Sequence, residues 1–199
     1  MEYEKIVEEE VKRVMKENKT RMLSHDFDHV KRVQKYALLI AEREGGDKEI
    51  LSIAALLHDI VTQRNPGEGN LLPKGMHAKL CSEKAREILL RVGYPKDKLE
   101  KVCKIISEHE WSQDIERNLE SQILYEADKL DSVGVFGALR HAYGIAEIGI
   151  PLIEGIKRRL KEIEKIKATY RTRTGKELFE SKLKPYLEVF EKALKEVEE

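Results

Sequence analysis

Histidine and aspartate occur in this chain in an order that could bind a divalent metal ion. His29 is followed by the adjacent pair His58 and Asp59, and then by Asp128. The pair ends an apolar run, residues 53–59, that should lie in a hydrophobic core. A carboxylate there loses several kcal/mol of hydration unless a cation or a strong donor meets it. A metal ion held by imidazole and carboxylate removes that cost and supplies a Lewis acid.

Helices must position these residues, because apolar side chains recur every three to four positions almost throughout. Two such stripes are Val7, Val11, Val14 and Met15, and Val30, Val33, Ala37 and Ile40. Asp47 is a predicted N-cap for the buried helix that leads into His58. The sequence contains no convincing run in which polar and apolar residues alternate, so it predicts no β-strand. We therefore predict a compact all-α fold of roughly seven to nine helices with no significant sheet.

The bulk composition favours one domain over residues 1–199, with a motif core at about 20–145 and C-terminal helices over 152–199 packed on it. Lys+Arg and Asp+Glu number 37 each, so neither a nucleic-acid nor a membrane partner is expected. The sequence has no apolar stretch of about 18 residues and no signal peptide pattern, which predicts a cytoplasmic protein. Cys81 and Cys103 fall on apolar helix faces, as reduced core residues do. A homo-oligomer is left open.

The donor types favour a divalent transition metal. Histidine nitrogen together with carboxylate oxygen suits Mn, Fe, Co, Ni or Zn better than an all-oxygen magnesium site. The candidate ligands come from at least three predicted helices, a common way to build a metal site in a helical core. The competing interpretation is that His58 and Asp59 only pair with each other or cap a helix end.

The motif order resembles the HD superfamily of metal-dependent phosphohydrolases. Segments 24–30, 54–60 and 126–134 are similar to its stand-alone YedJ/YpgQ-like branch, and segment 172–176 is similar to the C-terminal region of that branch. The resemblance implies the HD-domain fold. It also implies that the metal is bound by His29, His58, Asp59 and Asp128, with positions left open for water and substrate.

Further histidines bear on the number of metal ions. Some members of the superfamily bind a second ion through histidines located between the His-Asp pair and the final aspartate, and His77 and His109 lie in that interval. We expect one ion, with a second ion as the alternative and a phosphate contact as the other role for these residues. His25 precedes His29 by four residues and either lines the pocket or stabilises the helix start.

Cations near the motifs could bind the phosphate groups of a substrate. Lys129, Arg140 and Arg64 are the candidates, with a solvated side chain as the alternative for Lys129. Asp131 is expected either to orient a metal ligand from the second shell or to cap a helix. The charged stretch 157–167 is expected to be a solvated helix face.

One departure from related sequences concerns the proton carrier. Many HD nucleotidases have an acidic residue shortly after the His-Asp pair, but residues 60–64 contain only Arg64 as a charged residue. Either the metal-activated water needs no separate base, or the proton carrier is one of His25, His77 and Glu68.

These observations predict an enzyme that hydrolyses a phosphate ester or anhydride with metal-activated water. A nucleotide is the leading substrate: a nucleoside triphosphate first, because the resembling branch includes nucleotide pyrophosphohydrolases, and a monophosphate (nucleotidase activity) second. Manganese is one of the candidate metals. The alternatives are a di-iron oxygenase of the HD fold and a non-catalytic module that binds metal and nucleotide.

Overall fold

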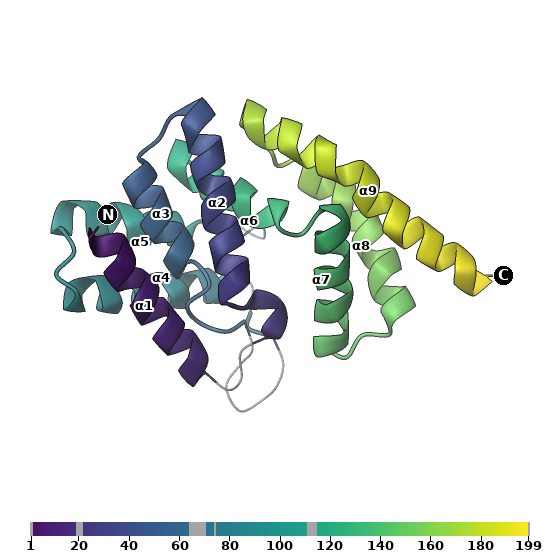
Figure 1. Cartoon of the computed structure of the whole chain (residues 1–199), viewed down its shortest axis with the longest axis horizontal. Coiled ribbons are helices and arrows are strands. Elements are labelled where there is room, and N and C mark those ends of the chain that lie inside the picture. The colour runs from purple at the N-terminus through teal and green to yellow at the C-terminus, as the bar shows by residue number, and fades with distance from the viewer. Residues whose placement is uncertain (1, 19–21, 64–70, 74, 111–114, 199) are drawn as a thin grey trace.

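The computed structural model of the chain describes residues 2–18, 22–63, 71–73, 75–110 and 115–198 (Figure 1). Within these ranges it contains nine α-helices and one short 3-10 helix, η1. No strand occurs there, and Leu71 alone forms an isolated bridge. The predicted all-α fold is therefore confirmed. The elements are α1 (Glu2–Glu17), η1 (Leu23–His25), α2 (Phe27–Glu44), α3 (Lys48–Leu57), α4 (Met76–Arg91), α5 (Lys96–Ser107), α6 (Leu119–Leu130), α7 (Gly134–Glu147), α8 (Leu152–Lys167) and α9 (Arg173–Glu198).

Helix α2 occupies the middle of the molecule, where it packs against α3 and α6 (Figure 1). Helices α1, α4 and α5 lie on one side of it, and α7, α8 and α9 lie on the other (Figure 1). The apolar stripe predicted for α2 is fully buried, because Val30, Val33, Ala37 and Ile40 have no exposed surface. Each buried aliphatic side chain of this kind stabilises a fold by roughly 1.5–3 kcal/mol relative to exposure.

Helix α3 brings the His-Asp pair into the core. Asp47 caps its N-terminus, accepting hydrogen bonds from the backbone N–H groups of Glu49 and Ile50 at 3.0 and 3.1 Å, as predicted. Residues 53–57 are completely buried. The helix ends at Leu57, and His58 is its C-cap residue. His58 and Asp59 therefore follow the end of the helix inside the molecule, where both are buried.

A buried carboxylate joins the start of α9 to α6. Glu126 accepts hydrogen bonds from Gln122 Nε2 at 2.7 Å and from the Thr172 backbone N–H at 3.0 Å, as well as from the Thr172 hydroxyl and the Arg171 backbone N–H. Gly175 packs directly on this network: a Cβ there would collide with Glu126 Oε2 and lie 2.7 Å from Thr172 Oγ1. This network therefore fixes the start of α9 to α6 at Glu126, which precedes Asp128 by two residues.

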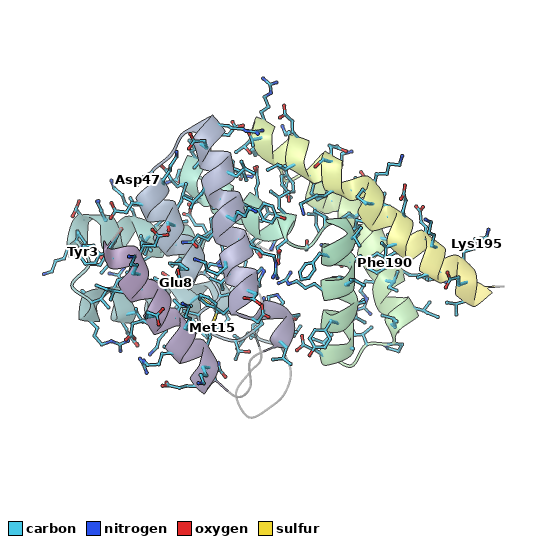
Figure 2. All side chains as sticks on the ribbon, in the orientation of Figure 1. Tyr3, Glu8, Met15, Asp47, Phe190 and Lys195 are labelled. Atoms are coloured by element: carbon cyan, nitrogen blue, oxygen red, sulfur yellow. The ribbon has the colours of Figure 1, made fainter. Side chains whose placement is uncertain are left out.

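Side chains fill the space between the ribbons (Figure 2). Met15 of α1 and Phe190 of α9 are buried, whereas Lys195 is exposed (Figure 2). Cys81 and Cys103 are buried and free, as predicted for reduced core residues. Among the described residues, no helix combines the length and the apolar character that crossing a membrane requires.

Candidate metal centre

Two groups of three side chains converge in the core, each with donor atoms within 4.8 Å of one another. The first group is His29, His58 and Asp128, and the second is Asp59, His77 and His109. All but Asp128 are buried, and Asp128 is partly buried. The side chains come from the first turn of α2, the residues after α3, the first turn of α4, the residues after α5 and the last turn of α6. The structure thus brings together all six histidine and aspartate residues that the sequence nominated for one or two metals.

Asp59 belongs to the second group and also faces the first. Its Oδ2 atom is 3.4 Å from His29 Nε2 and 3.8 Å from His58 Nε2. Its Oδ1 atom is 3.4 Å from His77 Nε2 and 4.0 Å from His109 Nε2. One carboxylate therefore presents one oxygen to each group, an arrangement that suits a bridging ligand.

The imidazole rings are oriented by hydrogen bonds at Nδ1. His58 Nδ1 donates to the carbonyl of Ala55 at 2.7 Å, and His109 Nδ1 donates to the carbonyl of Ile106 at 2.6 Å. His29 Nδ1 lies 2.8 Å from Asp131 Oδ2. With the proton on Nδ1, the Nε2 lone pair of each ring is available as a ligand.

The first group passes a direct test of fit to a metal ion. The Nε2 atoms of His29 and His58 are buried and have no hydrogen-bond partner among the described residues. Asp128 Oδ1 lies 3.5 Å from His29 Nε2 and 4.0 Å from His58 Nε2. Buried imidazole nitrogens without a donor or acceptor are costly, and a cation that accepts their lone pairs removes the cost.

At His58, His109 and Asp128, electrostatics favour the protonation states that bind metals. Burial lowers the pKa of His58, and burial together with His58 and His77 lowers the pKa of His109 to about 4. Burial alone would raise the pKa of Asp128, but the Lys129 ammonium, 2.6 Å from its Oδ2, and the nearby histidines hold it below its ordinary value. Neutral imidazole and ionised carboxylate are the forms that coordinate metals.

His29 and His77 behave differently from His58 and His109. Burial alone would lower the pKa of His77, but Cys81, Glu110 and Asp59 raise it to about 11. Burial and the charge of Arg140 lower the pKa of His29, but the hydrogen bond with Asp131 and the nearby Asp59 carboxylate outweigh them and raise it. Asp131 also accepts from Arg32 Nε at 2.6 Å and is the C-cap residue of α6. Both alternatives for Asp131, ligand orientation and helix capping, are therefore compatible with its position.

Glu110 was missed by the sequence analysis, although it directly follows His109. Its Oε1 atom is 3.4 Å from His77 Nδ1, and its carboxylate accepts from the backbone N–H groups of Gly75 at 2.7 Å and Ala78 at 3.1 Å. Burial would raise its pKa, but these donors hold it at about 2, so the group is ionised. Glu110 thus contacts His77 at Nδ1, the ring nitrogen that does not face Asp59, while it caps α4. Only the fold reveals this contact, since 33 positions separate the two residues in the chain.

Two cavities meet at Asp128 of the first group. One, of about 190 Å³, is lined by Lys129, Arg140 and His25 together with Asp128. The other, of about 380 Å³, is lined by the second group and by an apolar wall, Leu71–Pro73. His25, Gln63, Asp128 and Lys129 line both cavities. A ligand at Asp128 would therefore have a cationic cavity on one side and a partly apolar one on the other.

The remaining candidates have different outcomes. Arg64 and Glu68 lie outside the described residues. His25 lies in η1, before α2, with its ring centroid 5.4 Å from that of His29. Arg159 corrects the expectation of a solvated face over 157–167: it is half-buried and lines the smaller cavity, because α8 turns this side chain towards α6 and α9.

Comparisons with known proteins identify the family to which the chain is similar. The model of the HD domain family matches residues 26–133. The uncharacterized protein YpgQ of Bacillus subtilis (strain 168) is 27% identical over 121 residues, which cover 58% of this chain and 55% of that protein. The match thus spans only about half the length of this curated relative.

Solved structures extend the similarity over nearly the whole chain. The crystal structure of B. subtilis YpgQ in complex with ADP has a TM-score of 0.71 at 22% identity, covering 96% of this chain and 97% of that one. A predicted HD superfamily hydrolase from an uncultured Thermotogales bacterium has a TM-score of 0.62 at 26% identity, covering 96% and 90%. The matched region of the family model contains both groups of candidate ligands.

Proposed function

The chain belongs to the HD domain family, and on that premise we propose that it is a metal-dependent phosphohydrolase whose substrate is a nucleotide. The observation that carries the proposal is the buried convergence of His29, His58 and Asp128, with donor atoms within 4.8 Å and two histidine nitrogens that lack a hydrogen-bond partner. The nucleotide is supported by the cationic cavity beside Asp128. It is also supported by the similarity to YpgQ, which was crystallised with ADP.

In this proposal, His29, His58, Asp128 and Oδ2 of Asp59 hold one divalent transition metal. Manganese, iron, cobalt, nickel and zinc all accept this mixture of nitrogen and oxygen donors. When bound, such an ion acts as a Lewis acid on phosphoryl oxygens and lowers the pKa of a water molecule towards about 7. The remaining tasks of binding, shielding and proton transfer belong to side chains of the chain itself.

The residues around the ligands suit those tasks. Lys129 and Arg140 present cations to the phosphoryl oxygens, on which negative charge grows in the transition state. Burial and the charge of Arg140 hold the pKa of His25 well below its ordinary value, so its imidazole is a neutral base that lines both cavities. We assign to His25 the transfer of the proton from the attacking water. His25 would thus take the role of the acidic proton carrier, because residues 60–63 contain no acidic residue.

We further propose that the second group binds a second ion, with Asp59 as the bridge. The specific support is that Asp59 Oδ1 faces His77 and His109, while Oδ2 faces the first group. Two ions can clamp the attacking and leaving oxygens of a phosphoryl transfer. Metal content measured by mass spectrometry tests this: His109→Ala should retain one ion per chain where the unmodified protein retains two. Equal content in both proteins would contradict the second site.

The activity itself is tested with a panel of phosphorylated metabolites, assayed with Mn, Co, Ni, Mg and Fe in turn. Phosphate and pyrophosphate release are followed separately, because pyrophosphate marks cleavage of a nucleoside triphosphate next to the α-phosphate. Asp128→Ala is expected to abolish turnover of every hydrolysed substrate. Full turnover in that variant would refute the assigned site, and saturable binding without turnover would indicate a non-catalytic module.

The paired groups also support a second candidate function, a di-iron oxygenase. Two adjacent clusters that share a carboxylate could hold two irons as well as two hydrolytic ions. The protein purified without added metal distinguishes the two: two irons per chain together with oxygen consumption would favour the oxygenase. Metal-dependent release of phosphate or pyrophosphate without oxygen consumption would favour the hydrolase.

A further inference from the structure

The smaller cavity beside Asp128 extends away from the metal centre towards the C-terminal helices. Its walls come from the end of α6, from α7 and from α8. Three cationic side chains line it: Lys129, Arg140 and Arg159. Arg159 lies outside residues 26–133, to which the family model is matched, so it is a feature added by the C-terminal part of this chain.

Arg159 has neutral partners only. Its Nη2 atom donates to Ser132 Oγ at 2.7 Å, and its Nε atom donates to the Tyr186 hydroxyl at 3.3 Å. No carboxylate of a described residue lies within 4.0 Å of its guanidinium. A half-buried cation whose partners are all uncharged keeps its full charge available to a ligand.

Arg140 adds an unsatisfied donor to the same cavity. Its Nε atom donates to the Ser24 carbonyl at 2.5 Å and lies 3.5 Å from Asp131 Oδ2. Its Nη2 atom is buried and has no hydrogen-bond partner among the described residues. A buried N–H group of an arginine without an acceptor is costly, and an anion in the cavity would supply the acceptor.

The local field supports the same conclusion. His141 lines the cavity, and burial together with the charges of Arg159 and Arg140 lowers its pKa to about 3. The carboxylate in the wall, Asp128, already pairs with Lys129 at 2.6 Å. Two guanidinium groups that line one cavity repel each other, and a multiply charged anion between them relieves that repulsion.

We propose that Arg159 and Arg140 form a second phosphate subsite next to the metal centre, which selects substrates carrying two or more consecutive phosphates over phosphate monoesters. The inference rests on the proposed function and deepens it. In this arrangement, the substrate phosphate that is cleaved lies at Asp128. The next phosphate of the substrate extends into the cavity between α7 and α8. Arg159 is then a specificity-determining residue, because a monoester has no group that reaches it.

Calorimetric titration with inorganic pyrophosphate and inorganic orthophosphate tests the subsite in the metal-loaded protein. The unmodified protein should bind pyrophosphate at least about 10-fold more tightly than orthophosphate. Arg159→Gln should weaken pyrophosphate binding by about 10-fold or more and orthophosphate binding by less than about 2-fold. Arg158→Gln is the matched control, since Arg158 is exposed and paired with Glu154 at 2.7 Å, and it should change neither affinity.

The outcomes separate this inference from the proposed function. Equal binding of the two probes by the unmodified protein, or an unchanged preference in Arg159→Gln, would overturn the subsite. An equal loss of both affinities would show that Arg159 only supports the fold, which also overturns it. If Arg159→Gln does not fold, Arg159→Lys retains the charge but loses the forked donor pair, and its pyrophosphate affinity alone should fall. Because both probes are measured by binding, a protein without hydrolytic activity would refute the proposed function and leave this result unaffected.

Discussion

Asp131→Asn is the sharpest test of how the metal centre is built. Asp131 is 2% exposed, and its Oδ2 atom accepts from His29 Nδ1 at 2.8 Å and from Arg32 Nη2 at 3.1 Å. Its Oδ1 atom accepts from Arg32 Nε at 2.6 Å. An asparagine has the same size but replaces one oxygen with a donor group, which must then face one of these N–H groups.

The magnitude follows from the role of this hydrogen bond. A carboxylate behind a histidine ligand fixes the ring and increases the basicity of its other nitrogen, and its loss typically costs about 10- to 100-fold in metal affinity. This corresponds to about 1.4–2.8 kcal/mol of binding free energy. Since His29 Nε2 is one of the proposed donors, we expect a weakening in this range for the first site. Activity should recover at saturating metal.

The assay is competition for Mn²⁺ with a fluorescent chelator, combined with the metal dependence of turnover. Asp97→Asn is the matched control, because this carboxylate is exposed on α5 and should leave metal affinity unchanged. A folded Asp131→Asn protein that binds Mn²⁺ as tightly as the unmodified chain would refute the reasoning. Loss of activity that saturating metal does not restore would show that Asp131 acts in some other way.

Three further predictions concern stability. Removing the metal with a chelator should lower the melting temperature by about 5–10 °C if metal had been present at about 100 times its Kd, and His58→Ala should show a smaller metal-dependent shift in calorimetry, because only the second group is left intact. Glu126→Ala should destabilise the fold by about 3 kcal/mol in urea unfolding, because the donors of Gln122 and Thr172 lose a buried acceptor; an effect below 1 kcal/mol would contradict that role. Gly175→Ala should cost about 1–3 kcal/mol, since its Cβ would collide with Glu126, and a melting temperature equal to that of the unmodified protein would refute the close approach.

Local patterns in the sequence were sufficient for the helices and for the identity of the first candidate ligands. The apolar spacing of residues 30–40 predicts the buried face of α2, because a helix returns to the same side every 3.6 residues. Asp47 is a recognisable N-cap, since its side chain bonds to N–H groups only two and three residues away. His58 and Asp59 stand out because a charged group after five fully buried residues demands a partner.

The tertiary structure alone decided how those residues meet. The two oxygens of Asp59 face different groups, and nothing near residue 59 in the sequence specifies which histidines lie on either side. Glu110 behind His77 and Glu126 beneath Thr172 likewise form pairs across 33 and 46 positions of the chain. Such contacts depend on the packing of whole helices, which a local pattern does not encode.

Arg159 also shows that a local pattern does not determine how a side chain is placed in the fold. In the sequence it belongs to a charged stretch whose spacing is typical of a solvated helix face, and its neighbour Arg158 does lie on that face. Adjacent residues on a helix point about 100° apart, so the placement of α8 against α6 and α9 determined which arginine enters the cavity. The sequence determined that a metal could be bound and which helices would form. The packing of those helices decided how the site is divided and which cations line it.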